Sequence, residues 1–243
     1  MLLSAEHLSI NFGSRQLLDD VNFYLNEGDK TGIIGINGTG KSTFLKVLAG
    51  LTEPDAGTIS RNPNVQVSVL SQNPAMQDDA TILEQVFLHF PAEFRELNEY
   101  EAKTMLNRLG LSDFTQKVGT LSGGQRKRVA LAAALIHPAD VLILDEPTNH
   151  LDIKYQLQLM ELVRVLGRTV VAAIHDLNLA ALYCQRLYVM KAGRVAASGT
   201  PEEVLTPELL REIYEVEAEV ARDSRGCLRI FFQPIRNEGE ESI

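Results

Sequence analysis

The residues of this chain with the clearest chemistry lie in a glycine-rich loop, Gly35-Ile-Asn-Gly-Thr-Gly-Lys41-Ser42. The loop matches the pattern G-x-x-x-x-G-K-[ST], in which backbone N–H groups and the following helix N-terminus bind phosphate oxygens. Lys41 is expected to reach the β- and γ-phosphates of a nucleotide, and the Ser42 hydroxyl to bind Mg²⁺. The predicted nucleotide-binding residues here are Asn37, Gly38, Thr39, Gly40, Lys41, Ser42 and Thr43.

Two adjacent carboxylates, Asp145 and Glu146, follow the apolar run 141–144. Such a run is typical of a strand that is buried on both faces, where unpaired acids would be costly. A cation and a water explain both acids: Asp145 is predicted to hold Mg²⁺, and Glu146 to act as the general base that activates water. The alternative for this pair alone is two solvated acids at a strand end.

A second glycine-rich segment, Leu121-Ser-Gly-Gly-Gln125, precedes Asp145 in the chain. By itself it could be a helix start with Ser122 as N-cap. Together with the two motifs above, it resembles the signature of the ATP-binding-cassette (ABC) family. The resemblance implies an ATP hydrolase that uses ATP and Mg²⁺ and works as a head-to-tail dimer. Its signature residues would grip the γ-phosphate of ATP on the opposite subunit: Ser122, Gly123, Gly124 and Gln125.

The same resemblance implies roles for four further residues. Gln72 would contact Mg²⁺ and transmit the nucleotide state, and His175 would contact the γ-phosphate. Asp152, in the pair Leu151-Asp152, would cross the dimer interface beside the nucleotide. Phe12 would stack on adenine, with packing in the core as its alternative. The implied catalytic residues are Glu146, His175 and Gln72, and the implied metal ligands are Ser42, Gln72 and Asp145.

These motifs require a scaffold, and the resemblance implies an α/β P-loop NTPase cassette. It has a mostly parallel central sheet, an N-terminal antiparallel β subdomain and an inserted α-helical lobe. A single domain is expected over residues 1–243, with its core in 1–72 and 141–243 and its lobe in 73–140. Apolar and alternating patterns predict strands at 5–12, 21–25, 31–35, 65–70, 141–145, 169–174 and 186–190, and helices at 80–90, 93–109 and 178–183.

The C-terminal part carries its own local signals. Thr200-Pro201 and Thr206-Pro207 each combine a capping threonine with a proline at the first helical position, which predicts two short helices. Alternation at 217–221 and 228–232 predicts a terminal hairpin over 217–235. The acidic stretch 237–242 is expected to be frayed.

Composition excludes several kinds of protein. The chain has 243 residues, 45% of them hydrophobic, as in an ordinary globular α/β domain. Its longest apolar run, 129–136, is far too short to span a membrane, and no secretory signal is recognisable. A net charge of −9 disfavours nonspecific nucleic-acid binding, so Arg126-Lys127-Arg128 is interpreted as a solvated helix face. Two distant cysteines, Cys184 and Cys227, predict a reduced, cytoplasmic environment.

Within the ABC family the resemblance points two ways. Residues 1–152 resemble the ABC-F class, which acts on ribosomes, whereas residues 153–243 resemble ATPase subunits of siderophore, haem and cobalamin importers. An importer subunit would dock a polytopic membrane permease through its helical lobe and lie at the inner face of the membrane. An ABC-F-like factor would bind a ribosome, although the single cassette and the acidity disfavour it. A recombined, stand-alone cassette that pairs only with itself is the third hypothesis.

Overall fold

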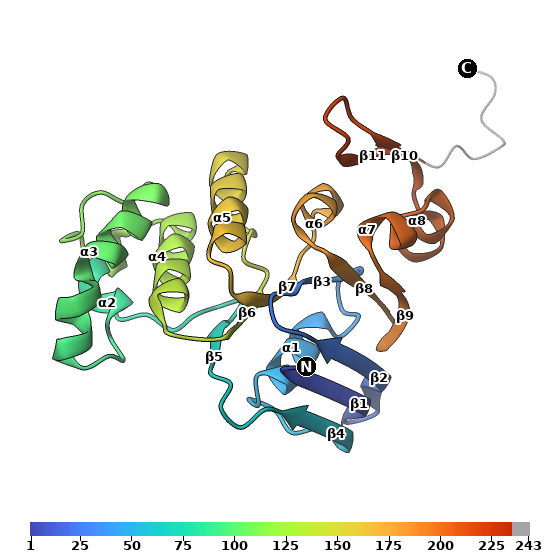
Figure 1. The fold of residues 1–243 in the computed structure, drawn as a ribbon, viewed down its shortest axis with the longest axis horizontal. Helices are drawn as coiled ribbons and strands as arrows, with labels where there is room; N and C mark the ends of the chain where they lie inside the picture. Colours follow the sequence, from blue (N-terminus) through green and yellow to red (C-terminus); the bar gives the residue numbers. More distant parts are fainter. Residues whose placement is uncertain (235–243) are drawn as a thin grey trace.

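The computed structural model describes residues 1–234, and its centre is a six-stranded sheet (Figure 1). The strand order is β5-β6-β7-β3-β8-β9, with every neighbouring pair parallel except β8 and β9. Its strands are β3 (Lys30–Ile34), β5 (Val67–Leu70), β6 (Val141–Asp145), β7 (Thr169–Ala173), β8 (Arg186–Lys191) and β9 (Arg194–Gly199). Every residue of β6 and β7 is buried, which is why both strands could be predicted from continuous apolar runs.

An antiparallel sheet with the order β2-β1-β4 packs against one side of the centre. Its strands are β1 (Leu3–Phe12), β2 (Arg15–Leu25) and β4 (Ala56–Arg61). Figure 1 shows α1 (Lys41–Leu48) between the two sheets, where the ring of Phe44 meets that of Phe23 edge to face at 5.3 Å. No residue of β4 is fully buried, so it lacks the alternation that predicts a strand.

A helical lobe lies at the end of the central sheet where β5 is the edge strand (Figure 1). It contains α2 (Ile82–Val86), α3 (Ala92–Arg108) and α4 (Gly123–Ile136). The prediction of a helix over 80–90 was too long. A capping box between Thr81 and Glu84 starts α2 at Ile82, and the helix ends after one further turn.

The interpretation of Arg126-Lys127-Arg128 as a solvated helix face was wrong. Lys127 and Arg128 are both buried, and Arg126 pairs with Asp78 at 2.6 Å. Arg128 stacks over the ring of Tyr155, with 3.9 Å between the guanidinium carbon and the ring centroid. A run of cations is usually exposed, but these two side chains find carbonyl oxygens inside the protein.

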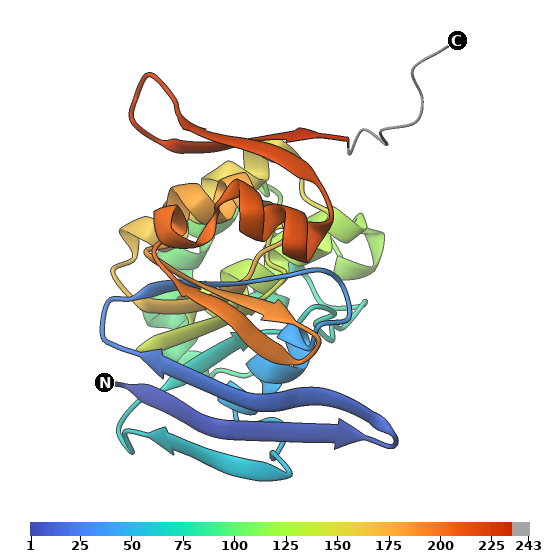
Figure 2. The ribbon, with the colours of Figure 1, turned by 90° about the vertical axis from the view of Figure 1, so that its right-hand side faces the viewer.

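The remaining helices follow β6 in the chain. They are α5 (Ile153–Val165), α6 (Leu177–Tyr183), α7 (Pro201–Val204) and α8 (Pro207–Tyr214). The hydroxyls of Thr200 and Thr206 cap α7 and α8 as predicted. The predicted strands of the terminal hairpin are present as β10 (Glu217–Arg222) and β11 (Leu228–Gln233). Figure 2 shows this hairpin at the opposite end of the molecule from β1, β2 and β4.

The stretch 237–242 lies outside the described residues, and the predicted domain boundaries stay predictions. Within residues 1–234, none of the helices combines the length and the apolar character that crossing a membrane requires.

Candidate functional site

The predicted phosphate loop connects the end of β3 to the start of α1. At two of its positions, glycine is required both because the backbone has positive φ and because there is no room for a Cβ atom. Gly35 has φ 141°, and a Cβ there would lie 2.3 Å from the Met190 carbonyl oxygen. Gly40 has φ 98°, and its Cβ would lie 2.4 Å from the carbonyl oxygen of Leu17. Neither position can hold a side chain without moving the backbone that packs against the loop.

An open pocket of about 180 Å³ lies over this loop. The residues that line it include six of the seven predicted nucleotide-binding residues of the loop and Glu146. The full lining is Arg15, Leu17, Asn37, Gly38, Gly40, Lys41, Ser42, Thr43 and Glu146. Thr39 is instead buried, and its hydroxyl donates to the Ile36 carbonyl at 2.9 Å, so it supports the loop from beneath.

Lys41 folds back over its own loop. Its ammonium donates to the carbonyl oxygens of Gly35 at 2.7 Å and Ile36 at 2.9 Å. Burial lowers the pKa of this lysine, while the charges of Glu146 and Asp145 oppose that shift. The cation is therefore already held within the loop in which phosphates are predicted to bind.

Ser42 and Asp145 meet where a metal ion was predicted. The Ser42 hydroxyl donates to the Asp145 carboxylate at 2.8 Å, and the side chain of Asp145 is buried. Burial raises the pKa of Asp145, the hydrogen bond from Ser42 opposes this shift, and the charge of Glu146 adds to it. A hydroxyl and a buried carboxylate form an oxygen donor set suited to Mg²⁺.

Glu146 is held by three side chains. Its carboxylate accepts from Gln72 Nε2 at 2.8 Å and from Asn149 Nδ2 at 2.5 Å, and its other oxygen lies 2.7 Å from His175 Nε2. Burial alone would raise its pKa, but the contacts with His175 and Gln72 and the charge of Lys41 outweigh this effect and lower the pKa. Glu146 has φ 51°, a left-handed conformation that is costly for glutamate and typical of functional sites.

The sheet topology explains why these residues converge. Gln72 follows β5, and His175 follows β7. Asp145 is the last residue of β6, and Glu146 comes directly after it. Because β5, β6 and β7 are adjacent and parallel, their carboxyl ends lie at one edge of the sheet. Ligands of open α/β sheets bind outside that edge. The structure therefore brings together the predicted catalytic set and the predicted metal ligands.

The signature motif does not join this cluster. Ser122 caps α4: its hydroxyl accepts from the Gln125 N–H at 3.3 Å, and the Gln125 side chain accepts from the Ser122 N–H at 2.9 Å. The N-cap that was an alternative function for Ser122 is thus present. Ser122 and Gly123 are exposed, and a Cβ on Gly124 would lie 2.9 Å from the carbonyl oxygen of His150. The motif lies beside the segment that leads to Asp152.

Two further predicted residues lie at the surface. Asp152 is at the N-cap position of α5, exposed, and makes no side-chain capping bond. The Phe12 side chain, near the turn between β1 and β2, is 79% exposed, which excludes the alternative of packing in the core. An aromatic ring that the core leaves uncovered is available to stack on a base.

Sequence reasoning missed three residues of the site. Arg15 donates to the Gly38 carbonyl at 3.0 Å and brings a cation to the pocket over the phosphate loop. Asn149 holds Glu146 from three residues further along, a contact that the turn after β6 creates. Lys127 lies 3.1 Å from the Gln72 carbonyl oxygen. Only Asn149 had a possible signal, because its spacing from Glu146 suits a turn.

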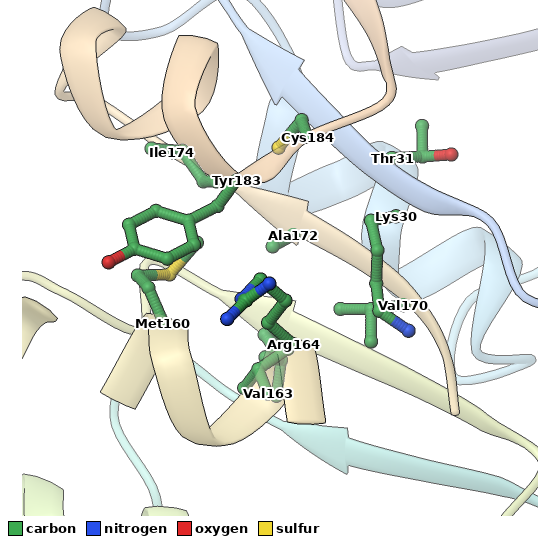
Figure 3. Close-up of a pocket in the computed structure, with 11 residues that line it drawn as sticks. Lys30, Thr31, Met160, Val163, Arg164, Val170, Ala172, Ile174, Tyr183 and Cys184 are labelled. Atoms are coloured by element: carbon green, nitrogen blue, oxygen red, sulfur yellow. The ribbon is translucent and has the colours of Figure 1, made fainter. Parts of the chain in front are cut away.

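A second pocket lies away from this site, between α5, α6 and the central sheet (Figure 3). Its volume is about 20 Å³, room for one water. Figure 3 shows Met160, Tyr183 and the sulfur of Cys184 among the side chains that line it. Burial raises the pKa of the Cys184 thiol to about 12. This pocket is too small for a nucleotide.

Comparison with known proteins agrees with the geometry. Residues 18–149, which include the phosphate loop, the signature motif and Glu146, match the family model described as ABC transporter. The chain is 34% identical to the iron(3+)-hydroxamate import ATP-binding protein FhuC of Bacillus subtilis, over 98% of this chain and 97% of that protein.

Solved structures agree as well. A transporter assigned to the metal-chelate type, in an inward-facing conformation, superposes with a TM-score of 0.79 and 25% identity over 97% of both chains. An ATP-binding cassette bound to ADP and Pi, a dimer in a post-hydrolysis state, superposes with a TM-score of 0.73 and 26% identity. That match covers 82% of this chain and 99% of the other.

Proposed function

The chain belongs to the ABC transporter family and is an ABC-type ATPase, and from this premise we propose that it drives the import of a metal chelate. In this proposal two copies pair head to tail and couple ATP hydrolysis to a membrane permease. The relative named for iron(3+)-hydroxamate import and the metal-chelate type structure support this substrate class.

The observation that carries the ATP-hydrolysing part of the proposal is the hydrogen-bonded cluster around Glu146. Its neighbours Gln72, Asn149 and His175 fix the carboxylate at the edge of the sheet, and its lowered pKa keeps it ionised at neutral pH. An ionised, oriented carboxylate beside the phosphate loop can accept a proton from an attacking water. His175 would contact the γ-phosphate, and Lys41 would leave the loop carbonyls to bind the phosphates.

Mg²⁺ would be held by Ser42 and Asp145, with Gln72 beside them. When bound, it would neutralise charge on the phosphates of ATP. The oxygen donors fit this ion because Asp145 is buried and, among the residues that the structure describes, its carboxylate accepts only from the Ser42 hydroxyl. Phe12 would stack on adenine, while Arg15 and the loop residues Asn37, Gly38, Thr39, Gly40 and Thr43 would surround the phosphates.

The second copy is proposed because the signature motif is exposed and separate from the catalytic cluster. Ser122, Gly123, Gly124 and Gln125 would close the site of the partner copy, and Asp152 would cross the same interface. The dimeric cassette among the similar structures supports this arrangement. The helical lobe would dock the permease, which would place the chain in the cytoplasm at the inner face of the membrane.

The mass of Glu146→Gln in solution, with and without Mg-ATP, tests the proposal. The amide keeps the shape of the side chain but cannot accept the proton, so turnover should fall about 10²–10⁴-fold. Because ATP still binds and is not consumed, we expect a shift from monomer to dimer when Mg-ATP is added. Light scattering after size exclusion measures it.

Lys41→Ala in the Glu146→Gln background is the control. It should stay monomeric, because a phosphate loop without its lysine holds ATP weakly. A Glu146→Gln protein that binds ATP but stays monomeric would argue against the dimer. Unchanged turnover in Glu146→Gln would refute the general base.

A further inference from the structure

Lys127 is a buried cation within a run of three basic residues, a pattern that predicts an exposed side chain. It lies in the second turn of α4, two residues after the signature motif, and is 7% exposed. Its ammonium lies among three backbone carbonyl oxygens, at 3.1 Å from Gln72, 3.4 Å from Asp145 and 3.5 Å from Ser71. These carbonyls belong to the two segments that carry the predicted metal ligands Gln72 and Asp145.

The sheet explains why these carbonyls need a donor. The last residues that β5 and β6 pair are Leu70 and Leu144, so Ser71 and Gln72 lie beyond this ladder. Asp145 lies beyond it on the β5 side and still pairs with Ala173 of β7 on the other side. Backbone carbonyls past the end of a ladder lose their partners, and leaving them unpaired in a buried place is costly. The Lys127 ammonium has three donors and lies where the ladder stops. It therefore bridges the two segments.

The next residue anchors the same helix in another direction. Arg128 donates to the Leu109 carbonyl at 2.5 Å, at the end of α3, and stacks over Tyr155 of α5. Lys127 thus connects α4 to the catalytic edge, which is the sheet edge that carries Gln72, Asp145, Glu146 and His175. Arg128 connects α4 to the end of α3 and to α5. Both residues lie within two turns of Ser122, so the helix that begins at the signature motif is connected to all three places.

We propose that Lys127 is a positioning residue that couples the signature motif of a copy to the catalytic edge of the same copy. The inference rests on the proposed dimeric ATPase. When α4 moves onto the nucleotide of the partner, Lys127 carries the Ser71-Gln72 and Asp145 carbonyls with it. Gln72 and Glu146 are then aligned in one copy by an event at the other site. Burial lowers the pKa of the Lys127 ammonium, and the charges of Asp145 and Glu146 oppose that shift.

Lys127→Met tests this coupling, because methionine fills the space of the stem but offers no donor. We expect kcat to fall about 10- to 100-fold, since small misplacements of catalytic groups have effects of this size. The KM for ATP and the ATP affinity should change less than about twofold, because the loss concerns alignment only. Lys127→Arg, which keeps a cationic donor, should recover a measurable part of kcat.

Lys103→Met is the matched control, since Lys103 pairs with Glu99 at the surface of α3 and should leave kcat unchanged. Thermal unfolding of each variant identifies a folding defect. Parallel losses of kcat, ATP affinity and stability in Lys127→Met, without recovery in Lys127→Arg, would overturn the inference, because they indicate a purely structural role. An unchanged kcat in Lys127→Met would overturn it too.

Mixed dimers locate the effect. In each, one copy carries Glu146→Gln, so that only the other copy turns over. When Lys127→Met is placed in the copy that keeps Glu146, the rate of a single turnover should fall as it does in the Lys127→Met homodimer. When Lys127→Met is placed in the Glu146→Gln copy, that rate should stay the same. The reverse pattern would overturn the inference, because the lysine would then act only across the interface. Absence of a nucleotide-driven Glu146→Gln dimer would instead refute the proposed function.

Discussion

The catalytic edge with its phosphate loop and the signature motif both combine polar residues with glycines. Only the catalytic edge has its functional side chains held in place by contacts within a single copy. Around Glu146, each carboxylate oxygen has a side-chain partner within the same copy. At Ser122 and Gly123 the helix N-terminus is exposed, and within residues 1–234 the Ser122 side chain bonds only to its own helix, through the cap. The folding of one copy therefore explains the residues of the first region. In the second region it explains the capping pair and Gly124, which lies against the His150 carbonyl, but it leaves Gly123 unexplained.

The glycines of the two regions make the difference concrete. A Cβ on Gly35 or Gly40 would collide with backbone, whereas a Cβ on Gly123 would have nothing within 4 Å. Gly123 is also absent from the residues with positive φ, and glycine is the poorer residue inside a helix. A glycine that its own fold does not need indicates a requirement from outside the copy. In the proposed dimer, that requirement is the close approach of a nucleotide bound to the partner copy.

The largest effect is expected from Gly123→Val. This variant tests whether the signature motif meets a partner copy or is merely the start of a helix. The monomer should fold with a similar melting temperature and bind ATP as before, because the added side chain meets open space. Nucleotide-driven pairing should be lost and turnover should fall about 100-fold or more, since the valine side chain would keep the signature motif from closing over the nucleotide bound to the partner. Calorimetry, light scattering and an ATPase assay measure the three quantities.

Gly35→Ala is the contrast. Its Cβ must displace the Met190 carbonyl, so we expect lower stability and lower ATP affinity together. A Gly123→Val protein that still pairs and turns over normally would show that the signature motif approaches no nucleotide.

An intermediate effect is expected from Phe12→Ala. The exposed ring contributes nothing to the core, so stability should not change. ATP affinity should fall about 2- to 13-fold, the equivalent of roughly 0.5–1.5 kcal/mol for a stacked aromatic pair. Phe12→Tyr should keep the affinity. Equal ATP affinity in Phe12→Ala and the parent, measured by calorimetric titration, would remove Phe12 from the site.

The smallest effect concerns acid stability. The pKa of Glu146 in the fold lies below its ordinary value of 4.5. The ionised form thus stabilises the fold fully above pH 4.5, and this contribution is lost as pH falls through the lower, folded-state value. We expect the difference in unfolding free energy between the parent and Glu146→Gln to shrink below that pH. Ser122→Ala, which loses a cap worth about 1 kcal/mol, should be destabilised equally at every pH.

If the Glu146→Gln difference stayed constant down to acid pH, the contacts at His175 and Gln72 would not depend on the charge of Glu146. Burial raises the pKa of Asp145, so its contribution has the opposite sign and decreases stability as pH rises past 3.8. Asp145→Asn separates the two acids.

Much of this site could be predicted because it depends on local patterns. The apolar runs of β3, β6 and β7 predict buried parallel strands, and the motifs that follow them predict which side chains meet at the edge. The family, the α/β fold and the importer-type ATPase were confirmed by the comparisons and the structure. The ABC-F resemblance of residues 1–152 and the hybrid interpretation stay predictions.

What could not be predicted depends on long-range contacts. β4 has one half-buried residue and no buried one, and β9 alternates only between exposed and half-buried positions before the buried Gly199, so neither shows the strong apolar alternation that predicts a strand. Lys127 and Arg128 read as solvent-exposed because nothing local reveals the carbonyls of Gln72 and Leu109 that receive them. Composition assigns a lysine to the surface, and only the end of a distant strand pair makes its burial favourable.

The thiol beside the small pocket has a practical consequence. Cys184 as a residue is half-buried, but burial of its sulfur raises the thiol pKa to about 12 and leaves it almost entirely in the unreactive thiol form at neutral pH. The chain has only one other cysteine, the half-buried Cys227, between β10 and β11 in the terminal hairpin. We therefore expect a maleimide probe to modify the native protein at Cys227 in preference to Cys184, without any engineered cysteine. In a pair of copies, two such probes form a spectroscopic ruler between the two hairpins.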